Sequence, residues 1–352
     1  GTDLRAVWRK IWFSQAQLVG SWTQDASGAH AGVLWDATLY DRTGRAYGNH
    51  GEIVGVSPNF VAASGFVPRT NFAQVRFFNR FSWYGRPGSL VEQVSTFVLY
   101  SPLWRYDDFL HARSTIEGGL QNTWLVNARG GWGITVNLSD VEQRFDPAAY
   151  TQYTTGTPTT PFTVPHGLYN LLGANAGVNT PNRALTAAVT VGYGAVPIFA
   201  EAAAGHELDV QVTLTWRPTQ AIRVDALWTH ARITRARDAS RFSVANIPRL
   251  KLEYQLSRAI FFRYVGQYFA QDQAALADPA TGQPLFIAQQ PAAAQAVTEF
   301  RNDFLFSYKP TPGTVVFVGY GASLTEPVAF QFQHLSRTSD GFFLKVSYVF
   351  RL

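Results

Sequence analysis

Residues 208–216 read Leu-Asp-Val-Gln-Val-Thr-Leu-Thr-Trp, so apolar and polar side chains alternate there without interruption. Successive side chains of a β-strand point to opposite faces, and this spacing therefore predicts a strand with one apolar and one polar face. The same alternation recurs on both sides of this segment, most clearly over 250–256, 300–309 and 342–352. The sequence predicts an all-β protein built from many such strands.

The connections between these segments alternate in length along the chain. Tight turns rich in Gly, Pro and Asn, residues that favour chain reversal, occur at 43–44, 85–88, 130–131, 180–182, 217–220, 256–258 and 309–313. The intervening connections are mostly longer, at 56–70, 104–114, 145–166, 271–297 and 325–338, with shorter ones near 24–29, 198–206 and 236–240. Short turns at one end and longer loops at the other are typical of outer-membrane barrels, whose turns face the periplasm. A soluble β-sandwich has no reason to sort its connections in this way.

Counting between the connections predicts a transmembrane antiparallel β-barrel of about sixteen strands, with short periplasmic turns and longer extracellular loops. We expect a single domain over 1–352, with 1–9 as a periplasmic lead-in before the first strand. The expected strands are 10–24, 29–42, 45–56, 71–84, 89–103, 115–129, 131–144, 167–179, 183–197, 206–217, 220–235, 241–256, 258–270, 297–309, 313–325 and 339–352.

Composition agrees with a membrane-embedded sheet. Charged residues make up only 15% of the 352 residues and hydrophobic residues 46%, whereas soluble domains average about 25% charged residues. No run approaches the roughly 20 apolar residues that a membrane-spanning helix needs. The chain has no cysteine, which excludes disulfides and thiolate metal sites. The formal net charge is +5, but Lys and Arg are scattered singly, so we expect no nucleic-acid partner and no cofactor.

Aromatic side chains next to the tight turns form a second pattern. Amphipathic rings prefer the headgroup level of a membrane, so we expect a periplasmic girdle on the lipid side. An alternative is that these rings belong to the core of a soluble sandwich. The girdle residues are Trp83, Trp132, Trp216 and Tyr308.

Three stretches resemble a known family. Residues 59–70 contain Gly-Phe-Val-Pro-Arg, residues 302–321 contain Asn-Asp-Phe-Leu-Phe-Ser-Tyr and Phe-Val-Gly-Tyr-Gly, and residues 337–352 end the chain with Lys-Val-Ser-Tyr-Val-Phe-Arg-Leu. Together they resemble the C-terminal region of the domain of unknown function 5916 family, in which an N-terminal domain similar to family-9 carbohydrate-binding modules precedes it. The resemblance implies an outer-membrane barrel in contact with carbohydrate or another polymer. It implies no catalytic residue.

Charged residues of both signs occupy the polar positions of the strands. We expect them to line an aqueous lumen and to bias its solutes through the local field. An alternative is that they form salt-bridged ladders that fill the barrel. The segment 271–297 is the best candidate for a plug, although a plain surface loop remains open. The expected lining residues are Arg76, Arg80, Asp209, Arg223, Asp225, Lys251, Glu253, Arg263, Arg301, Asp303, Lys345 and Arg351.

Catalytic patterns are weak. No His-Glu-x-x-His spacing occurs among the seven histidines, which excludes a zinc-protease helix. Two histidines lie beside carboxylates, His206 near Glu207 and Asp209, and His111 near Asp107 and Asp108.

The favoured function is a porin-like channel or transport barrel for polar solutes in the outer membrane of a Gram-negative bacterium, not an enzyme. Its expected partners are outer-membrane lipid and, as further candidates, a periplasmic or surface protein and carbohydrate. The alternatives are a non-conducting membrane anchor for such a protein and, with less support, an outer-membrane hydrolase.

Overall fold

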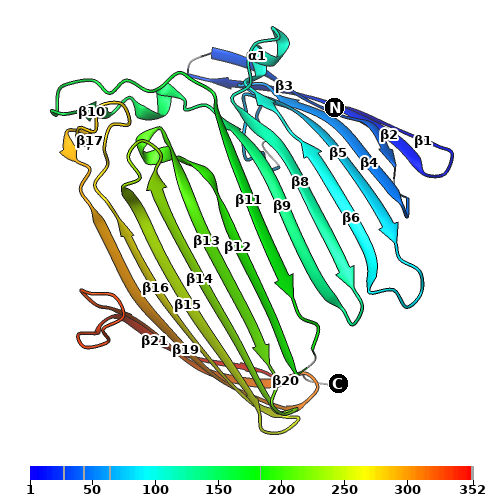
Figure 1. Ribbon diagram of the computed structural model, residues 1–352, viewed down its shortest axis with the longest axis vertical. Helices are drawn as coiled ribbons and strands as arrows, with labels where there is room; N and C mark the ends of the chain where they lie inside the picture. Colours follow the sequence, from blue (N-terminus) through cyan, green and yellow to red (C-terminus); the bar gives the residue numbers. More distant parts are fainter. Residues whose placement is uncertain (27, 43, 63–64, 183, 350–352) are drawn as a thin grey trace.

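The computed structural model describes all residues except 27, 43, 63–64, 183 and 350–352. Its main feature is one antiparallel sheet of eighteen strands, shown in Figure 1. Sixteen of these strands have ten or more residues, and they match the sixteen expected from the alternation. They are β2 Trp12–Asp25, β3 Gly28–Arg42, β4 Tyr47–Val56, β5 Phe72–Tyr84, β6 Val91–Tyr100, β8 Glu117–Ala128, β9 Trp132–Gln143, β11 Tyr169–Asn179, β12 Leu185–Ile198, β13 Ala203–Trp216, β14 Ile222–Arg235, β15 Arg241–Gln255, β16 Ile260–Gln273, β19 Gln295–Thr311, β20 Thr314–Thr325 and β21 Ser336–Ser347.

The sheet is a meander in which each long strand pairs with the next long strand along the chain. The two-residue β7 (Leu103–Trp104) continues β6 beyond Pro102 and pairs with β5. This confirms the prediction of a large all-β sheet with antiparallel neighbours.

The first residues of the chain differ from the expected lead-in. Thr2–Trp8 form a further strand, β1, which pairs antiparallel with β2 from Thr2 opposite Leu18 to Trp8 opposite Trp12. The reversal between them uses positive φ angles at Arg9 and Lys10, of 49° and 64°. Sequence reasoning missed this hairpin because its turn lacks the Gly, Pro or Asn that marks the other reversals.

The alternation of connection lengths is also confirmed. Eight short reversals lie at one end of the strands, which we call the turn side, at 9–11, 43–46, 85–90, 129–131, 180–184, 217–221, 256–259 and 312–313. The connections at the opposite end, the loop side, include 57–71, 101–116, 144–168, 274–294 and 326–335. The short helix α1 (Tyr106–Leu110) and the strands β10 (Tyr153–Thr155) and β17 (Leu285–Ile287) lie in these loops. Figure 1 shows α1, β10 and β17 gathered at that end.

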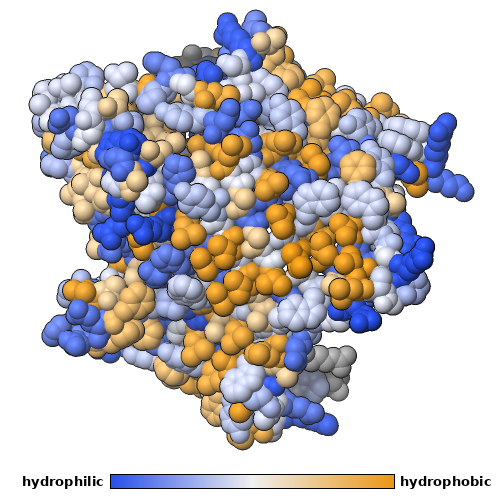
Figure 2. All heavy atoms as spheres, viewed as in Figure 1, coloured by the Kyte–Doolittle hydropathy of each residue, from blue (hydrophilic) through white to orange (hydrophobic). Residues whose placement is uncertain are grey.

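The two faces of the sheet differ in polarity. In β13, Leu208, Val210, Val212, Leu214 and Trp216 lie on one side, and their polar neighbours lie on the other. Figure 2 shows apolar residues gathered in a band across the middle of the first face, with hydrophilic residues toward both ends of the strands. We call these surfaces the apolar face and the polar face. In Figure 1, β19–β21 bend back behind β14–β16, which places the polar face on the inside of the curve.

The described sheet has two free edges. Among the described residues, β1 pairs only with β2, and β21 pairs only with β20. All residues of both strands are exposed. Because every pair between them is antiparallel, β1 and β21 run in the same direction, from the loop side to the turn side.

Candidate channel lining and loop cap

Strand register places the expected lining residues together on the polar face. Arg223 lies opposite Glu253, which in turn lies opposite Arg263 in the next strand. Asp225 lies opposite Lys251. By the same period of two, Arg76, Arg80, Asp209, Arg301, Asp303 and Lys345 also lie on this face. Arg351 falls outside the described residues.

Several of these charges are paired with one another. Lys251 Nζ lies 2.8 Å from Glu253 Oε1 and 3.8 Å from Asp225 Oδ2. Arg223 Nε lies 3.0 Å from Asp225 Oδ2. Two of these ion pairs lie within one strand, and only the pair of Lys251 with Asp225 joins β14 to β15.

Two further carboxylates belong to this face and were not predicted. Glu52 Oε2 lies 3.1 Å from Arg76 Nη1, and Glu299 Oε1 lies 2.7 Å from Arg301 Nε. Glu299 lies two residues before Arg301 in the same expected strand, so the alternation in the sequence already places its side chain on the same face. Glu52 becomes relevant only through its register with Arg76, which the sequence does not specify.

Other cations on the polar face lack a carboxylate partner in the described part of the chain. Arg263 and Lys345 form no ion pair with another described residue, and Arg80 donates a hydrogen bond to the Gly44 carbonyl. A pocket of about 360 Å³ collects Arg249, Lys251, Arg263 and Asp303 against Phe343. The polar face over β15–β21 thus carries unpaired positive charge.

The four expected girdle residues lie at the turn-side ends of their strands on the apolar face. Trp83, Trp132, Trp216 and Tyr308 are 54%, 47%, 48% and 39% exposed. A sandwich core would bury them, so the alternative interpretation does not fit. At the loop side, Trp35, Trp104 and Phe109 form a second aromatic group, with ring centroids 5.8 Å apart for Trp35–Phe109 and 5.4 Å for Trp104–Phe109.

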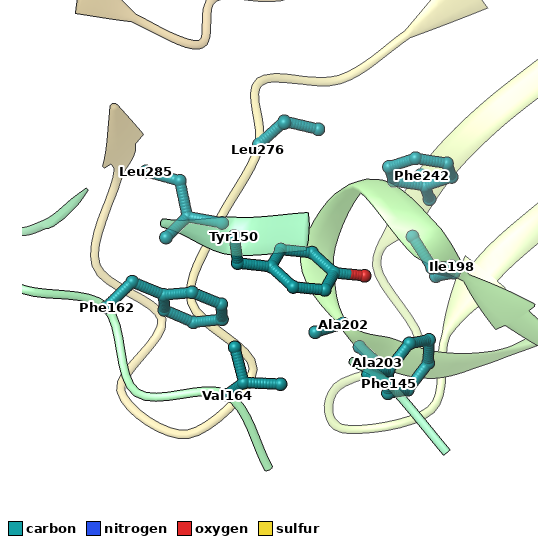
Figure 3. Close-up of a cluster of buried hydrophobic side chains, with 10 residues drawn as sticks. All are labelled: Phe145, Tyr150, Phe162, Val164, Ile198, Ala202, Ala203, Phe242, Leu276 and Leu285. Carbon is teal, nitrogen blue, oxygen red and sulfur yellow. The ribbon is translucent and has the colours of Figure 1, made fainter. Parts of the chain in front are cut away.

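Loops from distant parts of the chain form a compact cluster at the loop side, which we call the cap. β10 pairs with β17, which joins the 144–168 loop to the 274–294 loop. Figure 3 shows the buried side chains of the cap converging from these loops and from neighbouring strand ends. They are Phe145, Tyr150, Phe162, Val164, Ile198, Ala202, Ala203, Phe242, Leu276 and Leu285.

The cap covers the polar face rather than the apolar face. Ile198 of β12 lies opposite Ala203 of β13. Both occupy positions between the residues of the apolar face, so their side chains point to the polar face. Tyr169 and Ile233, which pack against the cap, also belong to the polar face. The cap therefore lies over the loop-side end of the polar face. The cap includes Leu276 and Leu285 of the 274–294 loop, so this loop packs over the sheet, and its role as a plug stays a prediction.

A buried ion pair fastens the cap to the sheet. Glu201 and Arg235 are 1% and 7% exposed, and Arg235 donates to both Glu201 oxygens, at 2.6 Å from Nη2 and 2.9 Å from Nε. The Ala277 amide donates to Glu201 Oε1 at 2.8 Å, and Arg235 Nη2 donates to the Ala275 carbonyl at 2.8 Å. The pair thus holds the start of the 274–294 loop. No local sequence pattern predicts this ion pair, because Glu201 and Arg235 come together only in the folded chain.

Burial also changes the chemistry of Tyr150 in this cap. Desolvation, with a smaller effect from Tyr153, raises the pKa of Tyr150 to about 12. Its hydroxyl donates to the Phe199 carbonyl at 2.6 Å. The neutral phenol therefore acts as a structural donor within the cap.

The histidine clusters considered for hydrolysis do not assemble. His206 lies on the apolar face and stacks on Tyr193, with centroids 6.1 Å apart, whereas Glu207 and Asp209 lie on the polar face. His111 Nδ1 lies 2.7 Å from the Asp107 carbonyl oxygen, and Asp108 pairs with Arg113. No group of three or more His, Asp or Glu residues in the described chain could hold a metal ion. None of its helices has the length and apolarity to cross a membrane.

Comparisons with known proteins give structural matches only. No protein-family model and no curated protein matches the chain. The chain is similar to the outer membrane protein OmpT of Vibrio cholerae (8% identity, 89% of this chain and 95% of that one, TM-score 0.37). It is also similar to the anion-selective porin from Comamonas acidovorans (9%, 95% and 98%, TM-score 0.33) and to the FrpB iron transporter from Neisseria meningitidis (12%, 89% and 57%, TM-score 0.44). Similarity at this level assigns no function.

Proposed function

We propose that this chain is a porin-like barrel of a Gram-negative outer membrane that passes small polar solutes through a lumen narrowed by the cap. The observation that carries the proposal is the sorting of side chains: an apolar band covers one face, and paired and unpaired charges cover the other. A soluble protein does not leave such a band exposed, whereas lipid covers it. The short turns face the periplasm in this proposal, and the cap faces outward.

Closure of the barrel follows from the membrane setting. Backbone N–H and C=O groups have no partners in hydrocarbon, so free strand edges are not tolerated there. We propose that β1 and β21 meet, and the junction is then parallel because both run from the loop side to the turn side. Parallel ladders are slightly less stable per residue than antiparallel ones, which makes this junction the weakest in the barrel.

Cysteine cross-linking tests the closure without background, because the chain contains no cysteine. Single cysteines at Leu4 or Ala6 in β1, paired with single cysteines at Leu344 or Val346 in β21, are expected to give an intramolecular disulfide in at least one combination. The measurement is migration on non-reducing gels after oxidation in detergent. Leu4→Cys with Val212→Cys, far across the sheet, is the control. Cross-links only between chains would contradict closure within one chain.

The cap favours a second candidate function, a non-conducting anchor for a surface or periplasmic protein. Its buried cluster lies over one end of the polar face and could leave no passage. Conductance of the purified chain in planar bilayers separates the two functions. Stable current steps support the channel, and their absence at high protein density supports the anchor. Contact with carbohydrate and membership of the domain of unknown function 5916 family remain predictions from the resemblance.

If the chain conducts, its unpaired cations should set the ion preference. Arg263→Glu and Lys345→Glu together are expected to shift the reversal potential toward cation selectivity in a salt gradient, because neither residue forms an ion pair with a carboxylate among the described residues. The charge-conserving Arg263→Lys with Lys345→Arg should leave the reversal potential unchanged. An unaltered potential in the charge-reversed variant would show that these side chains do not line the pathway.

A further inference from the structure

A pocket of about 420 Å³ lies at the loop-side ends of β8 and β9, beside the cap. Its walls come from four separate loops, which contribute Arg69, Arg105, Arg144 and Phe199. Four loops that converge on one hollow, held by a rigid sheet, are a common setting for a binding site.

The charges in this pocket leave one guanidinium uncompensated. Arg69 pairs with Glu117, and Arg105 Nη2 lies 2.8 Å from Asp146 Oδ2. Asp108 also lines the pocket, but its carboxylate pairs with Arg113, which lies outside it.

Arg144 is different from these residues. It has no carboxylate partner among the described residues; its Nη2 donates to Ser114 Oγ at 3.2 Å, and its Nε is buried without a hydrogen bond. Because Nε is buried, an anionic ligand in the pocket would be bound by the terminal Nη groups of Arg144, which have no carboxylate partner among the described residues.

Aromatic side chains also line the pocket. Phe145 and Phe199 meet edge to face, with centroids 6.0 Å apart and planes at 84°. Tyr150 adds its ring, while its hydroxyl is already bonded to the Phe199 carbonyl. Phe199 is 58% exposed, so an apolar ligand would cover surface that now faces solvent.

We propose that this pocket binds a small carboxylate that carries an apolar ring, with the carboxylate on Arg144 and the ring against Phe199. A planar guanidinium fits a carboxylate through two parallel hydrogen bonds, and aromatic walls select a flat apolar body. The site lies on the loop side and is independent of whether the barrel conducts.

Titration calorimetry of the full chain in detergent, with benzoate as the probe, tests the proposal. Benzoate should bind, Arg144→Gln should weaken it at least tenfold, and Phe199→Ala should weaken it severalfold. Arg129→Gln, which removes an exposed turn-side cation that neither lines the pocket nor pairs with a carboxylate among the described residues, should bind as the unmodified chain does. Unchanged heat-modifiable migration on gels shows that each variant is folded.

Two other probes assign the contributions. Benzyl alcohol keeps the ring and lacks the charge, and inorganic phosphate keeps a charge and lacks the ring; both should bind at least tenfold more weakly than benzoate. The proposal is overturned if benzoate does not bind, if Arg144→Gln binds it normally, or if either probe matches benzoate.

Discussion

Val212→Arg is expected to destabilise the membrane-inserted protein by about 2–4 kcal/mol, the cost of an arginine at the lipid face near the bilayer midplane. Val212 lies on the apolar face between Val189 and Trp228 of the neighbouring strands. It stands four residues from the girdle position Trp216, well inside the apolar band. The measurement is the urea concentration at which the heat-modifiable folded form is lost in lipid vesicles.

The adjacent residue provides a matched control. Gln211 is exposed on the polar face of the same strand, and Gln211→Arg is expected to change stability by less than about 0.5 kcal/mol, as is usual for surface substitutions. Equal destabilisation by the two variants would mean that the faces are wrongly assigned to lipid and lumen. Equal tolerance would mean that the apolar face does not contact hydrocarbon.

Arg235→Ala is expected to release the cap from the sheet. It leaves the Glu201 carboxylate buried with the Ala277 amide as its remaining donor, and an unpaired buried charge costs about 3–5 kcal/mol. The cap therefore opens locally before the sheet unfolds. We expect rapid proteolysis within 274–294 under native conditions and, if the barrel conducts, a larger single-channel conductance.

Two further variants make this test specific. Replacing both partners, Glu201→Leu with Arg235→Met, removes the uncompensated charge, and should recover much of the protease resistance because apolar substitutes for a buried pair are often tolerated. Arg337→Ala breaks an exposed pair with Asp340, whose side chains are 61% and 38% exposed, and should cost at most about 1 kcal/mol. If Arg235→Ala leaves 274–294 as resistant as before, the ion pair does not hold the cap.

The sheet was predictable because its signal is local. Alternation over a few residues, as in Leu208–Trp216, marks each strand and its two faces, and Gly, Pro or Asn marks most turns. The strand β1 was not predicted, because the turn at Arg9 and Lys10 contains no Gly, Pro or Asn. These two residues nevertheless adopt the positive φ angles that a tight hairpin requires.

The candidate sites were predictable only in part. Alternation assigns residues to the polar face one by one, and it predicted that Arg263 and Lys345 lie on this face of the sheet. The pairing of Arg76 with Glu52 depends on register, and the meeting of Glu201 with Arg235 depends on how loops fold over the sheet. A short stretch of sequence predicts neither ion pair. The pocket around Arg144 was missed for the same reason, because four separate loops form it.

The pairing of β10 with β17 has a consequence for the order of assembly. Every long strand finds its partner in the next long strand along the chain, so the sheet grows by adding local hairpins, at a small entropic cost for each closure. β10 and β17 are different, because their loops leave the sheet at β9 and β16 and meet only across the strands between them. We therefore expect the cap to form last, after the sheet beneath it has already paired.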